Sequence, residues 1–472
     1  MLASRSITCI RPTVAIARRN VAGRTTRSPP AVKPRRVQPR ASTEDAIKMP
    51  IFDPSSQSSY PTTAVTHVAF DVDVNFDDKV ISGTATASVT VESESSTLTL
   101  DTRDLHIERV QLDGADLTFV LGEVHPVMGA PLVIELGTRM DAGTAFDVVI
   151  TYRTSPSSSA VQWLRPEQTA GGTHPYLFTQ CQAIHARSLF PCQDTPGAKM
   201  TYSAKVTAPD PLTALMSAIP LGEPADVGDG KRCFEFEQRV PIPPYLLALA
   251  VGNVEAVEIG PRSKVWSEPE MVQAGAFEFA ETEDFLKAAE QVAGPYVWGR
   301  YDLLLLPPSF PYGGMENPCL TFVTPTLLAG DRSQAHVVAH EIAHSWSGNL
   351  VTNKTWEHFW LNEGFTVFIE RKIMNKMYGK SVFDFNAIGG LMELKETVAR
   401  LGESHPHSKV PYEKGFAFLV YLEHVTRGGG DGPEHADAAN GTPEFAEFLI
   451  EHFKRHQYNT VDTDDFKTAY TA

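Results

Sequence analysis

From Thr66 to about Gly260, hydrophobic and polar residues alternate along several short segments of the chain. An apolar side chain occupies every second position in HVAFDVDVNF, ISGTATASVTVES and FDVVITYRT, which is typical of strands with one buried face. Turn sequences such as DGAD and GDGK separate these segments. The pattern predicts an N-terminal β domain, which we assign to residues 44–256.

The periodicity changes near Val257, and helical patterns prevail from there to the end of the chain. Apolar residues recur every three or four positions in ETEDFLKAAEQVAGPYVWG and in TPEFAEFLIEHFKRHQ. Thr442 is suited to cap the second of these helices, with Pro443 at its first helical position. YDLLLLPPSF predicts a short buried strand, and residues 427–441 predict a surface loop. We therefore expect a mixed α/β domain over residues 257–472.

The first 43 residues differ in composition from the rest of the chain. They carry ten Arg or Lys and no Asp or Glu, with many Ser, Thr, Ala and Pro, which is typical of a transit peptide. The run RRVQPRAS resembles a plastid processing region, so we expect a plastid (chloroplast) location, with the mitochondrion as the runner-up. A basic tail on an enzyme of the cytoplasm is the alternative that composition leaves open.

Composition also limits the partners of the protein. A net charge of −16 argues against nucleic acid. No apolar run approaches the ~20 residues that a membrane span requires. The five cysteines form no CxxC pair, which favours reduced thiols over a disulfide framework. The sequence carries no signal for an oligomeric state.

The segment AHVVAHEIAHSWSGNL carries the first candidate chemistry. His340 and His344 are four positions apart, so a helix places both imidazoles on one face, where they can bind one zinc ion. Glu341 lies about 100° around the helix, where it can meet a zinc-bound water. Asp331 or Ser333 is suited to cap the start of this helix. The two histidines leave the site one ligand short, because catalytic zinc usually has three protein ligands.

A candidate for the third ligand lies downstream in TWEHFWLNEGFTVFIERKI. Glu363 follows His344 by nineteen positions and sits in the largely apolar stretch FWLNEGF. A buried carboxylate needs a partner, and a cation would be one. A turn near residues 351–354 would let this second helix pack against the first and bring Glu363 to the metal. The alternative is a solvated carboxylate on a helix surface.

Several separated motifs carry a resemblance to a known family. HEIAH, followed after eighteen residues by the glutamate of WLNEGF, resembles the gluzincin pattern of the peptidase M1 family of metallo-aminopeptidases. PYGGMENP resembles the exopeptidase loop of that family. QCQAIHARSLFPCQDTP and VPYEKGFAFLVYLE resemble its leukotriene A(4) hydrolase/aminopeptidase branch. The resemblance extends from about Thr66 to the C-terminus.

This resemblance implies an α+β multidomain fold. An N-terminal all-β, saddle-like domain would precede a thermolysin-like mixed α/β zinc catalytic domain. The implied activity is that of a zinc aminopeptidase, which acts on peptides with a free N-terminus and binds one zinc ion per chain. The implied zinc ligands are His340, His344 and Glu363, with Glu341 as the general base. Tyr412, in VPYEK, would stabilise the oxyanion through its hydroxyl group.

The resemblance also implies where the peptide lies. Glu316 would bind the free α-amino group of the substrate. The other residues that would line this pocket are Gln182, Gly313, Gly314 and Met315. Taken alone, GGMEN is equally compatible with a plain turn whose glutamate faces solvent. Glu370 lies seven positions after Glu363 on the same helical face, where it is either an orienting partner of a zinc ligand or a surface carboxylate.

Two departures from the family pattern affect the expected activity. The segment GESHPHSKVPYEKG, residues 402–415, is shorter than in the leukotriene branch. It lacks the aspartate and the second tyrosine that line the lipid and arginine pocket there. The family usually continues into a C-terminal helical domain, which we expect this chain to lack. Two alternatives stay open: a bifunctional aminopeptidase and epoxide hydrolase, and a truncated, inactive peptide-binding protein.

Overall fold

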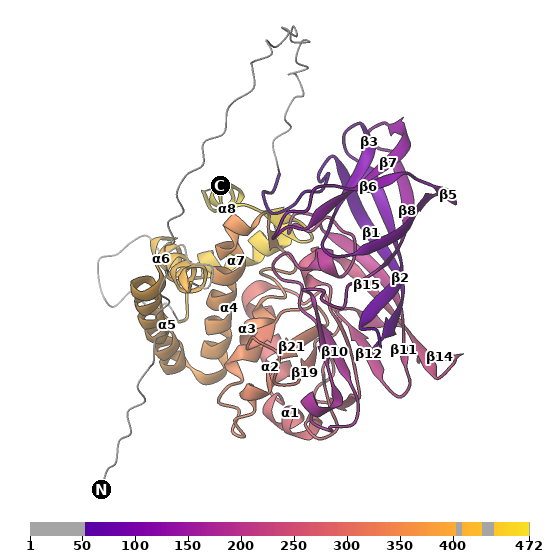
Figure 1. Cartoon of the computed structure of the whole chain (residues 1–472). Helices are drawn as coiled ribbons and strands as arrows, with labels where there is room; N and C mark the ends of the chain where they lie inside the picture. Colours follow the sequence, from indigo (N-terminus) through magenta and orange to yellow (C-terminus); the bar gives the residue numbers. More distant parts are fainter. Residues whose placement is uncertain (1–51, 403–407, 427–438, 472) are drawn as a thin grey trace, which may run out of the picture. The chain divides into compact units, whose positions relative to one another are not determined.

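The computed structural model describes residues 52–402, 408–426 and 439–471 of the chain. These residues belong to one compact unit (Figure 1). In this part of the chain, every helix is too short or too polar to span a bilayer.

Three regions singled out from the sequence lie wholly or partly outside the described residues. They are the expected leader 1–43, the expected loop 427–441 and the short segment 402–415. The leader and nearly all of the loop are outside, whereas the short segment is described at Gly402 and from Ser408 onward.

The N-terminal part of the unit is built on a nine-stranded sheet, which confirms the predicted β fold. The strands follow the order β13-β15-β11-β1-β2-β8-β4-β5, and β14 pairs with β15. Alternate residues of β1 are buried, including Val68, Phe70, Val72 and Val74, as the sequence pattern predicted. The bounds are β1 Thr63–Asn75, β2 Val80–Val91, β4 His106–Leu112, β5 Ala115–Asp116, β8 Ala145–Arg153, β11 Met200–Pro209, β13 Ile219–Pro220, β14 Ala225–Gly228 and β15 Lys231–Ile242.

Two smaller sheets complete the β domain. One has the order β3-β7-β6, and the other has the order β12-β16-β10-β9. The bounds are β3 Ser95–Thr102, β6 Phe119–Leu121, β7 Ala130–Met140, β9 Val161–Leu164, β10 Tyr176–Thr179, β12 Thr213–Met216 and β16 Leu249–Gly252. The segment after β10, which contains Gln182, leads from this domain toward the candidate site.

The second part of the unit combines a five-stranded sheet with helices, as predicted for the catalytic domain. The sheet has the order β17-β18-β19-β21-β20, in which β18, β19 and β21 are parallel. The bounds are β17 Glu255–Glu258, β18 Lys264–Ser267, β19 Asp302–Leu305, β20 Gly314–Met315 and β21 Leu320–Val323. β17 spans the predicted domain boundary at residues 256/257 and pairs with β18 in this sheet. The boundary itself stays a prediction.

The helices of this part lie beside the sheet (Figure 1). The bounds are α1 Val272–Glu278, α2 Thr282–Ala293, α3 His336–Ala343, α4 Trp360–Tyr378, α5 Lys380–Leu401, α6 Gly415–Thr426, α7 Pro443–His456 and α8 Thr463–Thr471. β22 Thr352–Asn353 pairs with β23 Thr460–Val461, and a π-helical turn, η6, spans Val410–Lys414. α3 packs on α4, and α4 also packs on α2, α5 and α6.

The predicted helix caps had different outcomes. Thr442 caps α7, since its Oγ1 accepts a hydrogen bond from the Phe445 N–H at 3.1 Å, which confirms the prediction. The predicted cap of α3 was wrong, because α3 begins at His336 with Ala335 at its N-cap position. Asp331 instead accepts from the Ser333 N–H at 2.9 Å in the preceding turn. A capping residue in the sequence therefore marked a turn and not the helix start.

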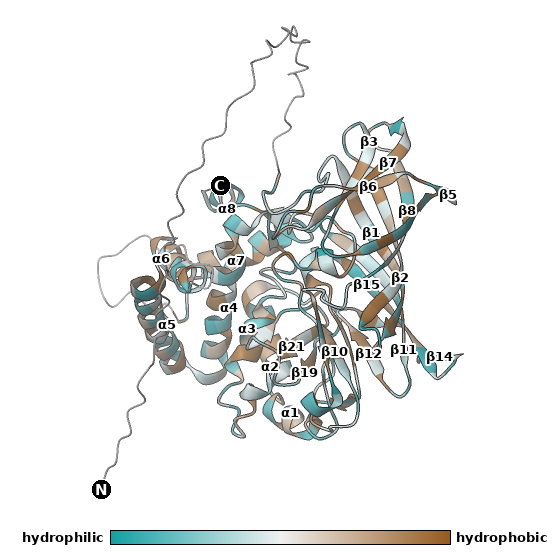
Figure 2. Ribbon diagram, in the orientation of Figure 1, coloured by the Kyte–Doolittle hydropathy of each residue, from teal (hydrophilic) through white to brown (hydrophobic). Residues whose placement is uncertain are grey.

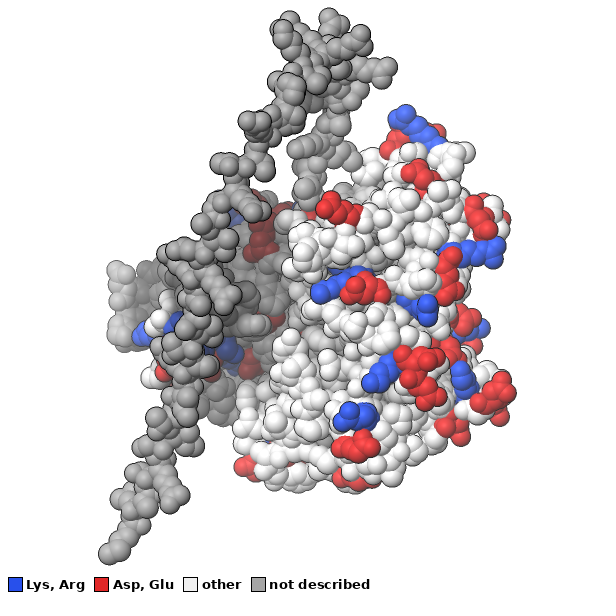
Figure 3. All heavy atoms as spheres, in the orientation of Figure 1, with Lys and Arg blue, Asp and Glu red and all other residues white. Residues whose placement is uncertain are grey.

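Hydropathy and charge follow the exposure of the elements. Hydrophilic (teal) and hydrophobic (brown) residues occur along the same strands and helices in Figure 2, as expected of elements with one buried face. On the face shown in Figure 3, Lys and Arg stand among Asp and Glu rather than in a continuous basic patch. Of the described cysteines, Cys181, Cys192 and Cys319 are buried thiols and Cys233 is half-buried.

Candidate metal centre and active site

α3 and the start of α4 bring three predicted metal ligands together. His340 lies in α3 and His344 directly follows it, and their ring centroids are 4.9 Å apart. Glu363 lies in the first turn of α4. Its Oε2 is 3.7 Å from His340 Nε2 and 3.4 Å from His344 Nε2. The ligand atoms of these three residues all lie within 4.8 Å of one another, which is close enough to share one metal ion.

The loop between the two helices explains why Glu363 reaches the histidines. Ser347 Oγ donates hydrogen bonds to the carbonyl oxygens of Leu361 and Asn362, both at 2.9 Å. The Asn362 side chain in turn accepts from the Asn353 N–H at 2.8 Å. These bonds tie the segment after α3 to the start of α4. Glu363 therefore lies beside the two histidines, as expected if the chain turns near residues 351–354.

Hydrogen bonds on the other ring nitrogens orient both imidazoles. His340 Nδ1 is 2.9 Å from Glu370 Oε2. His344 Nδ1 is 2.9 Å from the Ser347 carbonyl oxygen and 3.1 Å from Thr366 Oγ1. Both Nε2 atoms are thereby directed toward Glu363, as metal-binding histidines require. Glu370 lies where the orienting interpretation placed it, whereas sequence reasoning missed Ser347 and Thr366.

The Glu363 carboxylate shows that this cluster suits a cation. Its Oε2 atom is buried and has no hydrogen-bond partner among the described residues. Burial disfavours the charged form, but His344 and His340 outweigh this effect and lower the pKa of Glu363 to about 2. A buried, ionised oxygen without a donor is costly unless a cation neutralises it. Two imidazoles and one carboxylate are a donor set that zinc commonly takes.

Glu341 lies beside the metal ligands and close to the glycine loop. Burial raises the pKa of its carboxyl group to about 7, against the opposing charges of the two histidines. A Cβ atom at Gly314 would lie only 2.2 Å from Glu341 Oε1. Glycine at position 314 therefore leaves the space that the Glu341 carboxylate occupies. Gly314 thus also makes room for the proposed base, in addition to its expected place in the lining of the pocket.

The glycine loop is not a solvent-facing turn. Gly314 and Met315 form β20 at the edge of the five-stranded sheet, and Glu316 follows with only 5% of its surface exposed. Burial raises the pKa of Glu316. Gln182 Nε2 donates to Glu316 Oε1 at 3.4 Å, and Asn349 Nδ2 donates to the Glu316 carbonyl oxygen at 2.7 Å. Ligand atoms of Glu316, Glu341 and His344 also lie within 4.8 Å of one another.

The β domain contributes more to this pocket than was predicted. Gln182 lies there as expected, and Gln180 lies beside it, with Nε2 3.0 Å from Met315 Sδ. Gln180 Oε1 is buried and has no hydrogen-bond partner among the described residues. The repeat of glutamine at alternate positions in QCQ was the only sequence signal that could have identified Gln180.

Tyr412 faces the same cluster from the π-helical turn η6. Its ring stacks on His340 with centroids 6.3 Å apart and an interplanar angle of 23°. The ring of Phe359 meets it edge-on, also at 6.3 Å. Burial raises the pKa of Tyr412, and the charges of Glu363, Glu316 and Glu341 act in the same direction. The hydroxyl group therefore stays protonated and is available as a hydrogen-bond donor.

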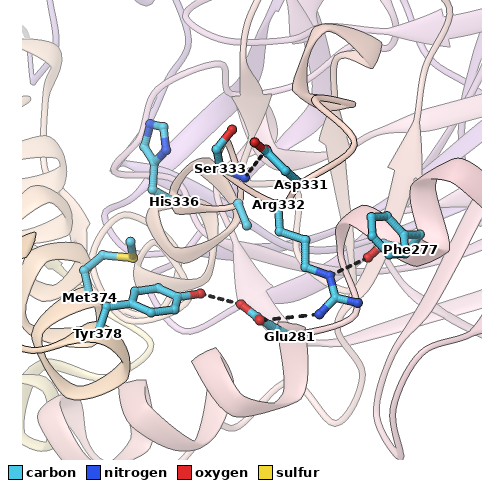
Figure 4. Close-up of a pocket in the computed structure, with 9 residues that line it drawn as sticks. Phe277, Glu281, Asp331, Arg332, Ser333, His336, Met374 and Tyr378 are labelled. Carbon is cyan, nitrogen blue, oxygen red and sulfur yellow. Dashed lines mark hydrogen bonds and ion pairs between the residues drawn. The ribbon is translucent and has the colours of Figure 1, made fainter.

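A cavity of about 680 Å³ opens at the N-terminal end of α3. Figure 4 shows hydrogen bonds and an ion pair among the residues that line it. Tyr378 and Arg332 both bond to Glu281, and Arg332 Nε donates to the Phe277 carbonyl oxygen at 3.0 Å. None of the predicted site residues lines this cavity. The candidate site is identified by its chemistry and not by the volume of a pocket.

Comparisons with known proteins agree with this geometry. The sequence-family model of the peptidase M1 N-terminal domain matches residues 64–246, and the sequence-family model of the peptidase family M1 domain matches residues 277–472. Leukotriene A-4 hydrolase of Xenopus laevis is 48% identical over 433 residues, which cover 88% of this chain and 69% of that protein. This chain belongs to peptidase family M1. Leucine aminopeptidase 2 of Yarrowia lipolytica is 43% identical over 442 residues, covering 89% of this chain and 65% of that protein.

Solved structures support the same M1 fold. Leukotriene A4 hydrolase from Saccharomyces cerevisiae has a TM-score of 0.79 and 38% identity, over 90% of this M1 chain and 67% of its own. An M1 zinc metallopeptidase from Deinococcus radiodurans has a TM-score of 0.70 and 22% identity, over 86% of this chain and 89% of its own, and it shows the fold alone. The chain spans about two thirds of the length of the curated relatives. The predicted family, fold class and enzyme class, a zinc metallopeptidase, are confirmed.

Proposed function

We propose that this M1 chain is an aminopeptidase that removes N-terminal residues from peptides and binds one zinc ion through His340, His344 and Glu363. One observation carries the proposal. Glu316 is a buried carboxylate outside the proposed ligand set, and its ligand atoms lie within 4.8 Å of those of Glu341 and of the proposed ligand His344. A peptidase that reads a free N-terminus needs a fixed anion beside its metal, because the α-amino group of a peptide is a cation.

The residues divide the chemistry among them. Zinc, when bound, supplies a Lewis acid that acidifies water and polarises a carbonyl group. The Glu341 carboxylate accepts the proton of the attacking water and passes a proton to the leaving nitrogen. Tyr412 donates a hydrogen bond from its hydroxyl group to the carbonyl oxygen as negative charge develops there. Glu370 holds the His340 ring in its orientation through Nδ1.

The substrate N-terminus is assigned to the space beside Glu316. Its carboxylate attracts the α-ammonium group, and Gln182 holds that carboxylate in place from the β domain. The glycine loop runs past this point as the edge strand β20, so a peptide backbone can lie along it. Gly313, Gly314 and Met315 line this part of the pocket.

The proposal is tested with the purified chain. Its zinc content should approach one ion per chain, and it should hydrolyse aminoacyl amides. Zinc at that level without turnover would instead favour the inactive peptide-binding alternative. The identity to leukotriene A-4 hydrolase makes epoxide hydrolysis a second candidate, and the short segment 402–415 argues against it. Conversion of a lipid epoxide to a diol by the chain would establish that second activity.

The plastid location is a separate proposal, supported by the composition of residues 1–43. A reporter protein fused behind these residues should enter plastids, with mitochondrial import as the competing outcome. A reporter that stays in the cytoplasm would contradict targeting by this segment. Because the segment is rich in Arg and poor in large apolar residues, its removal should leave zinc content and turnover unchanged.

A further inference from the structure

Two adjacent residues of α4 form buried ion pairs with the segments that follow it. Arg371 Nη2 is 2.8 Å from Glu413 Oε1, and Lys372 Nζ is 2.9 Å from Glu423 Oε2. Side-chain exposure is below 10% for all four residues. The pairs differ in where they lie along the chain. Arg371 and Glu413 directly follow Glu370 and Tyr412, whereas Glu423 lies in α6.

The Arg371–Glu413 pair is enclosed by closely packed backbone. A Cβ atom at Gly390 of α5 would lie 1.9 Å from Glu413 Oε2 and 2.4 Å from Arg371 Nη2. A Cβ atom at Gly364 of α4 would lie 2.8 Å from the Gly415 Cα atom. The glycines thus allow α4, α5 and η6 to approach one another around the pair.

The same pair is a poor choice for stability alone. Two charges lose their hydration on burial, and an apolar pair of similar volume often stabilises a protein equally well. Arg371 also has two buried nitrogens, Nε and Nη1, without a hydrogen-bond partner among the described residues. Its guanidinium lies over the Phe416 ring, 4.1 Å from the centroid. Because these donors are unused, we explain the pair by the orientation that it gives to the segments it links, and not by a contribution to the free energy of folding.

We infer that the Arg371–Glu413 pair positions Tyr412 for catalysis. It links the turn η6 to α4, the helix that also supplies Glu363 and Glu370. The Tyr412 hydroxyl is thereby held at a fixed place relative to the metal ligands. Both residues act through Tyr412 and are positioning residues. The inference rests on the proposed function, because it assumes that the hydroxyl group stabilises the oxyanion.

The first test changes each pair in turn and measures kcat, KM and zinc content with an aminoacyl amide. Displacement of a reacting group by about 1 Å costs roughly 100-fold, so Glu413→Gln and Arg371→Met should lower kcat by about 10- to 100-fold with KM nearly unchanged. Arg371→Lys should restore part of kcat, because it keeps the charge without the planar fork. The matched control is Lys372→Met, which breaks a pair equally buried on the same helix and should change kcat by less than about 3-fold.

A double variant separates positioning from folding. Arg371→Met combined with Glu413→Leu removes both charges and fills the space with apolar atoms. It should recover the thermal stability lost in Arg371→Met, while kcat stays low. Recovery of kcat together with stability would overturn the inference, because the pair would then serve folding alone.

Tyr412→Phe provides the decisive background. If the pair acts through the hydroxyl group, adding Glu413→Gln to Tyr412→Phe should change kcat by less than about 3-fold. If Tyr412→Phe is slow and the two losses multiply, the positioning inference fails while the role of Tyr412 stands. If Tyr412→Phe alone keeps a normal kcat, the proposed role of Tyr412 fails, and the inference fails with it.

Discussion

Two clusters of charged side chains lie at opposite ends of α3. They differ in burial and in the balance of positive and negative charge. At its N-terminal end, the Glu281 and Arg332 side chains are 29% and 34% exposed and form an ion pair at 3.5 Å. At its C-terminal end, three buried carboxylates surround two imidazoles, and the Oε2 atom of one of them, Glu363, has no donor. A cavity of about 680 Å³ adjoins the first cluster. Unbalanced buried charge marks the metal site.

The physical reason is the cost of removing charge from water. An ion pair that is open to solvent in part contributes little free energy, so its presence predicts nothing about ligands. A buried excess of negative charge must be neutralised. Glu316 and Glu363 outweigh the effect of burial and raise the pKa of His344 to about 9, so the surroundings of this imidazole favour positive charge. A bound metal ion would supply that charge.

Removal of a metal ligand should have the largest effect. His340→Ala, His344→Ala and Glu363→Ala should each lose bound zinc after dialysis, because two protein ligands hold the ion far more weakly than three. Turnover of an aminoacyl amide should fall by more than about 1,000-fold. Elemental analysis of the dialysed proteins provides the check. One equivalent of zinc retained by any of the three would remove that residue from the ligand set.

Replacement of the proposed base should separate metal binding from chemistry. Glu341→Gln keeps the shape of the side chain but cannot accept the proton of water. We expect a loss of about 100- to 10,000-fold in kcat with the zinc content unchanged. Elemental analysis and steady-state kinetics on the same preparation measure both quantities. A kcat near that of the unmodified enzyme would assign the base to another group.

Loss of the anion beside the metal should have a smaller and more selective effect. Glu316→Ala removes one charge-assisted contact to the α-ammonium group, at a cost of about 2–4 kcal/mol, or roughly 30- to 1,000-fold in kcat/KM. Zinc should stay bound. For the unmodified enzyme, an N-acetylated peptide should be a much poorer substrate than the same peptide with a free amine. Equal rates on the two peptides would mean that Glu316 does not read the N-terminus, and an endopeptidase assignment would replace the present one.

The smallest effects are expected in the half-buried cluster at the N-terminal end of α3. Arg332→Ala or Glu281→Gln should change the free energy of unfolding by no more than about 1 kcal/mol, because solvent screens the pair. kcat/KM should change by less than about 3-fold. Urea unfolding and peptidase kinetics measure these quantities. A loss above 10-fold in kcat/KM would show that the cavity at the start of α3 communicates with the metal site, and the contrast between the clusters would no longer hold.

The sequence by itself determined what depends on short separations. The spacing of His340 and His344 places both on one helix face, since helix geometry requires only local hydrogen bonds. Alternating burial identified the β domain, and Thr442 and Pro443 marked the start of α7. The order of separated motifs identified the family, which the comparisons confirm.

Only the tertiary structure decided which distant residues meet. Gln182 reaches Glu316 across 134 residues, Arg371 reaches Glu413 across 42, and Gly314 is restricted by the Glu341 carboxylate. The capping residues that the sequence offered for α3 lie in a turn instead. These outcomes depend on packing between elements, which sums many weak contacts over the whole chain. The identity of a glutamate is visible in the sequence, but its burial and its partner are properties of the fold.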